Sequence, residues 1–424
     1  MYLYSASISF LNMTQSVLDL LPLANSANEA LNRFTRIAPL TKGLVSGSQL
    51  LYERAAILGL KPKHGFSPGG SCHLVQCRDG VLAINLPRSS DWELIPAWLG
   101  PWIDHLNVAA NQWPLLATIC RDLEVGPLLR QAHCLGLAAA RADLLPPPPM
   151  EPLAKIELGA DWQPQQTGRF TQPLVVDLSS LWAGPLCGSL LQAAGCRVIK
   201  VEGSNRYDGA REGNPLFYQL MNQGKESVVL DFGSEFGIHR LHQLMDRADI
   251  VIEASRPRAL HHLGIHAERW VQAKRGRVWL SITGYGRTEP QGSRIGFGDD
   301  AGAAAGLCRI MYEATGRYQF VGDAIADPLT GIHGALYAWQ SYRTGASELI
   351  ALSLQEITAR CLHNEMSLNR HEVLESCRRW IRHSRDLGAL FPAGARQARL
   401  PTAMPGQHTE SVFQEPGTVG NSLV

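Results

Sequence analysis

The segment from Leu174 to Gly286 alternates short apolar stretches with helix-forming stretches, and this alternation limits the possible folds more than any other feature. The apolar stretches are LVVDLSS, CRVIKVE, KESVVLDF, DIVIEAS and RVWLSITGYG. Helical patterns lie between them, at AGPLCGSLLQAAG, Glu235–Ala248 and Ala267–Ala273. Strands that alternate with helices form parallel βαβ units. The sequence therefore predicts an α/β fold with a doubly wound, Rossmann-like parallel sheet.

The remaining segments indicate a second, smaller α+β domain. A turn-rich stretch predicts a β-hairpin with strands at His73–Gln76 and Val81–Asn85, joined by a turn at Asp79-Gly80. The four prolines at 146–149 predict a stiff linker. We therefore expect a small-domain-like α+β region at 1–150, a large Rossmann-like domain at 165–350, a helical return segment at 351–400, and a tail at 401–424 that docks in part.

Composition excludes several classes of partner. Of the 424 residues, 39 are Lys or Arg and 38 are Asp or Glu, so no global field attracts nucleic acid or an anionic membrane. The nine cysteines are scattered without a C-x-x-C pair, a pattern typical of reduced intracellular thiols. No apolar run approaches the roughly 20 residues of a transmembrane helix, and the N-terminal stretch lacks the basic region of a signal peptide. We expect a cytoplasmic protein without a bound metal.

Asp327 is the strongest single candidate for chemistry. The pair Asp327-Pro328 predicts a helix start, with Asp as the N-cap and Pro at the first helical position. A carboxylate at that position has two possible roles, because it can cap the helix or, kept ionised, attack as a nucleophile. The local pattern does not choose between them. Apolar residues at helical spacing predict that one face of this helix is buried, namely Leu329, Ile332, Leu336 and Trp339.

Four motifs, taken together and in order, resemble the class III CoA-transferase family, also called CaiB/BaiF, which includes formyl-CoA transferase and α-methylacyl-CoA racemase. They are VVDLSSLWAGPLCGSLLQAAGCRVIKVE, ADIVIEASRPRALHHLG, LSITGYG and GDAIADPLTG. The resemblance places Asp327 at the catalytic aspartate. It implies a CoA-thioester substrate, a carboxylic acid as second substrate, an enzyme-bound acyl intermediate, no permanently bound cofactor, and a homodimer. The hairpin region resembles the small domain of this family, which usually follows the large domain, so the order here is rearranged.

Candidate residues for binding coenzyme A lie in the loops that follow the predicted strands. Coenzyme A is a polyanion at its nucleotide end, and the best local basic cluster is Arg256 and Arg258 together with His261 and His262. The resemblance adds positions that match CoA-contacting residues of the family, namely Leu181, Ala183, Leu230, Ser255 and His262.

Three functions remain open from the sequence. The first is a CoA-transferase, which moves coenzyme A between an acyl-CoA and a carboxylic acid through an aspartyl anhydride and an aspartyl-CoA. The second is an α-methylacyl-CoA racemase or epimerase, but Phe297 stands where such enzymes use a proton-transferring histidine. The third is a catalytically silent acyl-CoA-binding homologue. Ser180 and Trp182 replace a histidine and a glutamine of formyl-CoA transferase, which argues against formyl-CoA and oxalate as substrates and makes Trp182 a candidate wall of a different acyl pocket.

Overall fold

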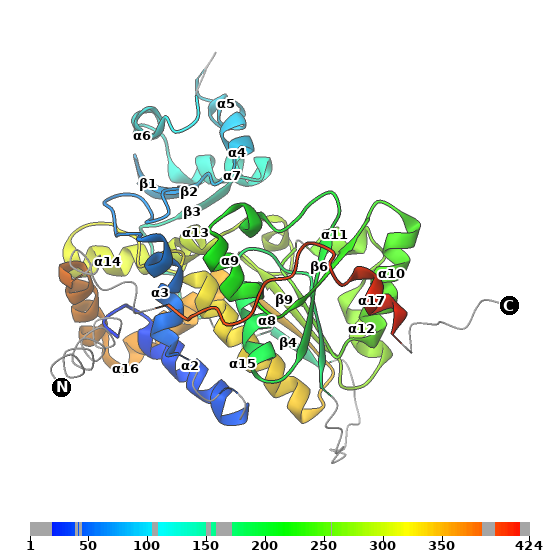
Figure 1. Ribbon diagram of the computed structural model, residues 1–424. Helices are drawn as coiled ribbons and strands as arrows, with labels where there is room; N and C mark the ends of the chain where they lie inside the picture. The colour runs from blue at the N-terminus through cyan, green and yellow to red at the C-terminus, as the bar shows by residue number, and fades with distance from the viewer. Residues whose placement is uncertain are drawn as a thin grey trace.

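The computed structural model describes residues 19–38, 41, 45–103, 109–149, 154–157, 172–255, 257–383 and 395–415. A large sheet with helices on both faces forms most of the molecule, and a small sheet with its own short helices lies at one end (Figure 1). Among the described helices, none combines the length and the apolar character that are needed to cross a bilayer.

The large sheet confirms the predicted doubly wound topology. Its strand order is β4-β10-β9-β8-β5-β6-β7, in which six strands are parallel and β4 pairs antiparallel with β10 at one edge. The strands are β4 (Ala154–Glu157), β5 (Leu174–Asp177), β6 (Arg197–Gly203), β7 (Glu226–Leu230), β8 (Ile250–Glu253), β9 (Val278–Thr283) and β10 (Glu348–Ser353). Every strand predicted between Leu174 and Gly286 is present.

Alternate residues of each central strand enter the two apolar cores on either side of the sheet. Val175 packs with α8 and α15 on one face, whereas Val176 packs with α10 and α12 on the other. This follows from the two-residue period of a strand that is covered on both faces. The covering helices are α8 (Ala183–Ala193), α9 (Pro215–Asn222), α10 (Glu235–Arg247), α11 (Pro257–His261), α12 (Ala267–Ala273), α15 (Ala326–Thr344) and α16 (Leu354–His383).

The small antiparallel sheet has the order β1-β2-β3, with β1 at Cys72–Cys77, β2 at Gly80–Asn85 and β3 at Ala138–Arg141. The predicted hairpin is confirmed, but Cys77 pairs with Gly80, so its two loop residues are Arg78 and Asp79 rather than Asp79 and Gly80. Its core is formed with α4 (Ser89–Glu93), α5 (Ile95–Leu99), α6 (Trp113–Cys120) and α7 (Val125–Leu135).

Further helices connect the two sheets. Helix α13 packs against β2 and β3 of the small sheet and also against α15. Helices α2 and α3, which precede the small sheet in sequence, share a core with α15. The bounds are α2 (Ala24–Ile37), α3 (Gly47–Leu58), α13 (Gly298–Ala304) and α14 (Leu307–Thr315). The domain limits expected from the sequence stay a prediction, and these contacts show how closely the first 150 residues are tied to the large sheet.

The tail packs along β7 at the edge of the large sheet. The backbone N–H of His408 donates to the carbonyl of Ser227 at 2.9 Å, and the hydroxyl of Thr409 accepts from the N–H of Val229 at 3.0 Å. Helix α17 (Thr409–Gln414) then places Val412 in the core beside α10. These bonds cover backbone groups that an edge strand otherwise leaves open.

Candidate functional site

Asp327 lies in the first turn of α15, at the carboxyl ends of the parallel strands. Helix α15 leads through residues 345–347 into the parallel strand β10, so its first turn must lie at that end of the sheet. The strand order reverses between β5 and β8, and open α/β sheets bind ligands in the crevice at such a switch point. The site predicted from the sequence therefore lies at the end of the sheet where a ligand is expected.

The carboxylate of Asp327 is free of the capping role that the sequence allowed. Helix α15 begins at Ala326 with Ile325 as its N-cap, so the predicted start, with Asp327 as the N-cap, is wrong by two residues. The reason is that residues 322–325 already turn, and the backbone N–H of Asp327 donates to the carbonyl of Ala324 at 3.0 Å. The predicted buried face of this helix is confirmed by Leu329, Ile332, Leu336 and Trp339.

Gly298 gives the Asp327 carboxylate its space. A Cβ atom at position 298 would lie 2.2 Å from Oδ2 of Asp327 and 2.5 Å from the carbonyl oxygen of Ala324, so only glycine fits between them. The backbone of Gly298 also hydrogen-bonds the carboxylate. The side chain keeps partial contact with solvent.

Burial raises the pKa of Asp327 to about 7. Arg54 and the Gly298 backbone bond oppose this rise, whereas the negative charges of Asp300 and Asp323 add to it. Near neutral pH, Asp327 therefore exchanges between a carboxylic acid and a carboxylate. Such a pKa is typical of a group that takes part in chemistry, although a structural network can produce it as well.

Asp327 belongs to a group of four acids, Asp299, Asp300, Asp323 and Asp327, which we call the aspartate cluster. Asp300 accepts hydrogen bonds from the Tyr285 hydroxyl at 2.5 Å and from the Asn85 amide at 3.0 Å. Asp299 accepts the backbone N–H of Ala324 at 2.9 Å, and its pKa is raised to about 7 by burial and by the charge of Asp323. Burial also raises the pKa of Asp323, against the opposing charge of Arg54.

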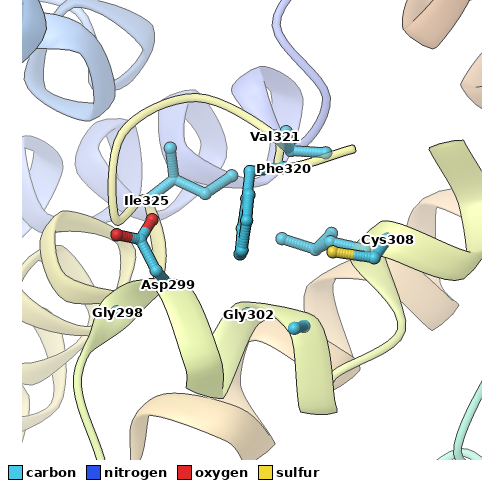
Figure 2. Close-up of a pocket in the computed structure, with 9 residues that line it drawn as sticks. Gly298, Asp299, Gly302, Cys308, Phe320, Val321 and Ile325 are labelled. Carbon is cyan, nitrogen blue, oxygen red and sulfur yellow. The ribbon is translucent and has the colours of Figure 1, made fainter. Parts of the chain in front are cut away.

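A small cavity of about 10 Å³ lies beside Asp299. Figure 2 shows the carboxylate of Asp299 near Ile325, with Phe320 and Cys308 on the neighbouring walls. This volume holds one water molecule at most. The cavity is too small for an acyl group.

The N-terminal region supplies polar partners to the aspartate cluster. Nη1 of Arg54 in α3 donates to Oδ2 of Asp323 at 3.0 Å. Asn85 at the end of β2 bonds Asp300, and the Ser67 side chain bonds Asp299. Segments that are more than 200 positions from the cluster in sequence thus complete its surroundings.

The predicted binding residues occupy several loops at the same end of the sheet. Leu181 lies in the loop after β5 with 42% of its surface exposed, and Ala183 begins α8 directly behind it. Ser255 follows β8, where its N–H and hydroxyl both donate to Oε2 of Glu253 at 2.9 Å. The loops after β5 and β8 flank the switch point, so the topology brings Leu181, Ala183 and Ser255 to the same end of the sheet.

The other predicted binding residues differ in their exposure and location. Arg258 and His262 are exposed on and just after the short helix α11. Leu230 ends β7 with its side chain buried among the residues of the face covered by α10, not the face covered by α15. Arg256 lies outside the described residues.

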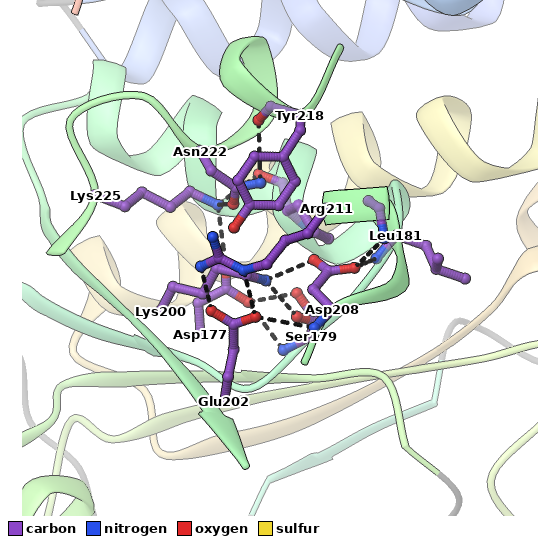
Figure 3. A network of polar contacts seen from close by, with 12 residues as sticks. Asp177, Ser179, Leu181, Lys200, Glu202, Asp208, Arg211, Tyr218, Asn222 and Lys225 are labelled. Atoms are coloured by element: carbon purple, nitrogen blue, oxygen red, sulfur yellow. Dashed lines mark hydrogen bonds and ion pairs between the residues drawn. The ribbon is translucent and has the colours of Figure 1, made fainter. Parts of the chain in front are cut away.

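A second polar group, which we call the charge network, lies beside the β5 loop (Figure 3). It contains three acids and three cations in ion pairs: Asp177 with Lys225, Asp208 with Lys200, and Glu202 with Arg211. Burial by itself would raise the pKa of Asp177, but the positive charges of Lys225 and Lys200 hold this pKa below its ordinary value.

The charge network fixes the conformation of the β5 loop. Oδ1 of Asp208 accepts the backbone N–H of Leu181 at 2.9 Å, and Leu181 has a φ of 69°, which is unfavourable for a leucine. Nζ of Lys200 donates to the carbonyl of Ser179 at 2.9 Å in the same loop. A balanced set of buried charges thus holds Leu181, the exposed leucine that the resemblance predicts as a contact for coenzyme A.

Sequence reasoning missed Arg54, Asp208 and Gly298. Arg54 stands in an ordinary amphipathic helix, and nothing local marks it as a partner of Asp323, which is 269 positions away. Lys200 and Glu202 gave a usable signal, because charged residues in a strand that is buried on both faces need partners. The need for glycine at position 298 depends on a contact between two distant elements and has no local signal.

The parallel strands of the large sheet lie in a region that matches a known protein family. The model of CoA-transferase family III matches residues 171–384. The succinyl-CoA:glutarate CoA-transferase of Homo sapiens is 30% identical over 215 residues, which are 47% of this chain and 49% of that protein. The succinyl-CoA–D-citramalate CoA-transferase of Chloroflexus aurantiacus is 28% identical over 193 residues, which are 43% of this chain and 48% of that protein.

The matched regions cover only part of each relative's length. The chain spans about half the length of the curated relatives that it matches. Among solved structures, a CaiB/BaiF family protein from Brucella suis is 27% identical with a TM-score of 0.43, over 47% of this chain and 57% of that chain. The family-model match begins just before β5 and ends just after α16, so α3 and the small sheet lie outside it.

Proposed function

The chain belongs to CoA-transferase family III, and we propose that it transfers coenzyme A from an acyl-CoA thioester to a carboxylic acid, with Asp327 as the nucleophile. The observation that carries this proposal is the environment of the Asp327 carboxylate. It does not cap α15, has a glycine beside it, keeps contact with solvent, and has a pKa raised to about 7. A carboxylate of raised pKa is more basic than usual and attacks better when ionised.

The first half of the transfer releases the donor acid. One oxygen of Asp327 attacks the thioester carbonyl carbon, a C–O bond forms, and the C–S bond breaks with its electron pair leaving on the CoA thiolate. The product is a mixed anhydride. The thiolate then attacks the aspartyl carbonyl carbon, which forms an aspartyl-CoA thioester and releases the donor acid as a carboxylate.

The second half runs the same steps in reverse with the acceptor. The acceptor carboxylate attacks the aspartyl-CoA carbonyl and expels the thiolate, which gives a new mixed anhydride. The thiolate then attacks the acceptor's carbonyl carbon, so the new acyl-CoA forms and the Asp327 carboxylate is regenerated. No proton is gained or lost overall. Neither step needs a resident cofactor, and coenzyme A is a co-substrate.

The proposed crevice for coenzyme A lies between the loops after β5 and β8. Leu181 and Ala183 line one side, and Ser255 lies on the other. Arg258 and His262 are exposed and can bind the phosphates of coenzyme A. Arg256 is proposed as a further phosphate ligand from its position in the sequence. Leu230 remains a proposed contact through its backbone, since its side chain is buried.

Water must be kept from the two intermediates, because anhydrides and thioesters hydrolyse. Ala324, Ile325 and Ala326 are buried around Asp327, and Gly298 closes one side. Such a site limits the water that reaches the aspartyl carbonyl. The acyl-CoA and the acid are the proposed partners, while a homodimer and a cytoplasmic location stay predictions from resemblance and composition.

Mass spectrometry after incubation with a panel of acyl-CoA thioesters tests this proposal. Hydroxylamine treatment should convert an activated aspartate into a hydroxamate on the tryptic peptide 318–343. That peptide contains both Asp323 and Asp327, so fragmentation must place the label on Asp327. The Asp327→Asn variant should give no label, whereas the matched Asp323→Asn variant should keep it.

Other outcomes would reject the transferase. Absence of any label and of CoA transfer, with acyl-CoA binding still measurable by calorimetry, would indicate the silent binding homologue. Exchange of the α-proton of an offered acyl-CoA with deuterium would instead indicate a racemase.

A further inference from the structure

Arg54 is the cation that faces the aspartate cluster from the N-terminal region. Its positive charge opposes the rise in the pKa values of Asp323, Asp327 and Asp299 that burial causes. It stands in α3, outside the part of the chain that matches the family model. The cluster and this arginine therefore meet only because the rearranged N-terminal region folds onto the large domain.

The guanidinium of Arg54 keeps N–H donors that bond no other described residue. Nη1 bonds Asp323, while among the described residues Nη2 and Nε have no hydrogen-bond acceptor. Nη2 lies 3.5 Å from the point where a Cβ on Gly69 would stand, so it faces the glycine-rich loop 67–71. The side chain remains 29% exposed. Donors are thus available beside Asp327.

Trp182 lies directly against this guanidinium. The Arg54 guanidinium carbon is 5.6 Å from the centre of the indole ring, a distance at which a cation and an aromatic face attract each other. Trp182 is 4% exposed, and its Nε1 has no hydrogen-bond partner in the described part of the chain. Such a buried donor is costly without an acceptor. A guanidinium with unpaired donors therefore packs on an indole ring whose own N–H has no partner among the described residues.

The chemistry of these donors identifies an anionic, planar group. A guanidinium binds a carboxylate through two parallel hydrogen bonds, and an indole N–H can add a third. The thioester end of coenzyme A must reach Asp327, whereas its phosphates lie at the far end of the long pantetheine arm. An anion that meets Arg54 therefore belongs to the acyl group or the acceptor acid rather than to the nucleotide.

We propose that Arg54, assisted by Trp182, binds the distal carboxylate of a dicarboxylic acyl group and so selects dicarboxylic over monocarboxylic substrates. This inference rests on the proposed transfer at Asp327. Asp323 does not saturate Arg54, because it engages only Nη1 and leaves the other edge of the guanidinium open.

Calorimetric binding tests the inference apart from turnover. All proteins carry Asp327→Asn, which prevents reaction, and the probes are succinyl-CoA, glutaryl-CoA and butyryl-CoA. The added pair Arg54→Met with Asp323→Asn removes the guanidinium without leaving a buried carboxylate unpaired. We expect the Kd of succinyl-CoA or glutaryl-CoA to rise at least about tenfold, and that of butyryl-CoA to change less than about threefold.

A second variant covers the case in which the pair fails to fold. Arg54→Lys keeps the charge but loses the planar fork, so it should weaken the dicarboxylic ligands only and by a smaller factor. Equal weakening of all three probes, or of none, would overturn the inference and would leave Arg54 as a charge that acts only on the aspartate cluster. Failure of the transferase proposal would appear separately, as absence of label and turnover in the protein with native Asp327.

Discussion

The charge network and the aspartate cluster are two buried polar groups at the same end of the sheet. They share one kind of hydrogen bond but differ in the balance of their charges. In each, a carboxylate accepts the N–H of a residue held at positive φ. Asp208 holds Leu181 at φ 69°, and Asp299 holds Ala324 at φ 46°, both at 2.9 Å. Strain of this kind persists only where the surroundings fix it, and it concentrates at functional sites.

The difference between them is the charge balance. Each acid of the charge network has its own cation, and the pKa of Asp177 is held low. The aspartate cluster has Arg54 in direct contact with Asp323 only, and burial raises the pKa of all four acids. Balanced charges make a rigid support for a loop, whereas unbalanced acids retain the proton affinity that reaction chemistry requires.

The largest expected effect is a loss of protein stability when one ion pair of the charge network is broken. Nζ of Lys225 bonds Asp177 at 2.9 Å, and both side chains are almost fully buried. Lys225→Met should lower the free energy of unfolding by about 3–5 kcal/mol, because it leaves Asp177 charged and unpaired. Urea unfolding followed by circular dichroism measures this loss. The double variant Asp177→Asn with Lys225→Met should recover most of it, and no recovery would mean that the network is not a balanced pair system.

The next effect concerns the space beside the nucleophile. Gly298→Ala should reduce kcat about 100-fold, because the new methyl group would displace the Asp327 carboxylate by about an ångström. Steady-state kinetics with the best acyl-CoA donor measures this. Gly302→Ala is the matched control in the same helix, since its Cβ would meet only the flexible end of Leu307 at 3.3 Å. Equal losses in both variants would show that α13 is merely intolerant of substitution.

The pH dependence separates the two groups further. As the proposed nucleophile, Asp327 would attack only as an anion, so kcat/KM should rise about tenfold per pH unit below pH 7 and level off above it. Asp323→Asn removes a neighbouring negative charge and should move the midpoint to lower pH. A profile that is flat from pH 5 to 8 would contradict an ionising Asp327.

Stability should respond to pH with the opposite sign. The pKa of Asp327 is raised from 3.8 to about 7 in the folded protein, so folding favours the protonated form. This contribution to stability is complete below the unfolded pKa and is lost as the pH rises toward 7. Asp327→Asn should therefore reduce the fall in stability between pH 4 and pH 8, which thermal unfolding at several pH values can measure.

The sequence predicted the strands more fully than the site. Apolar stretches and small-residue helices identified each strand after Leu174, because burial on both faces leaves a clear local pattern. The start of α15 was missed by two residues, since the preceding turn depends on Asp299 accepting the Ala324 N–H. The resemblance identified Asp327, but Arg54 reaches the site only through the packing of α3, which no local pattern contains.

The smallest expected effects come from relieving the strained residues. Glycine adopts positive φ freely, so Leu181→Gly and Ala324→Gly should each stabilise the protein by about 1 kcal/mol. Their kinetic effects should differ. Leu181→Gly should raise the KM for acyl-CoA severalfold with little change in kcat, because a proposed contact for coenzyme A is lost while Asp327 stays in place.

Ala324→Gly should act on kcat instead, since Ala324 lies beside Asp327 and its carbonyl accepts the N–H of that residue. Thermal unfolding and steady-state kinetics on the two variants measure both quantities. If Leu181→Gly lowers kcat and leaves KM unchanged, the β5 loop positions Asp327 rather than coenzyme A. The charge network would then support the same chemical step as the aspartate cluster, and the division of roles between the two groups would be wrong.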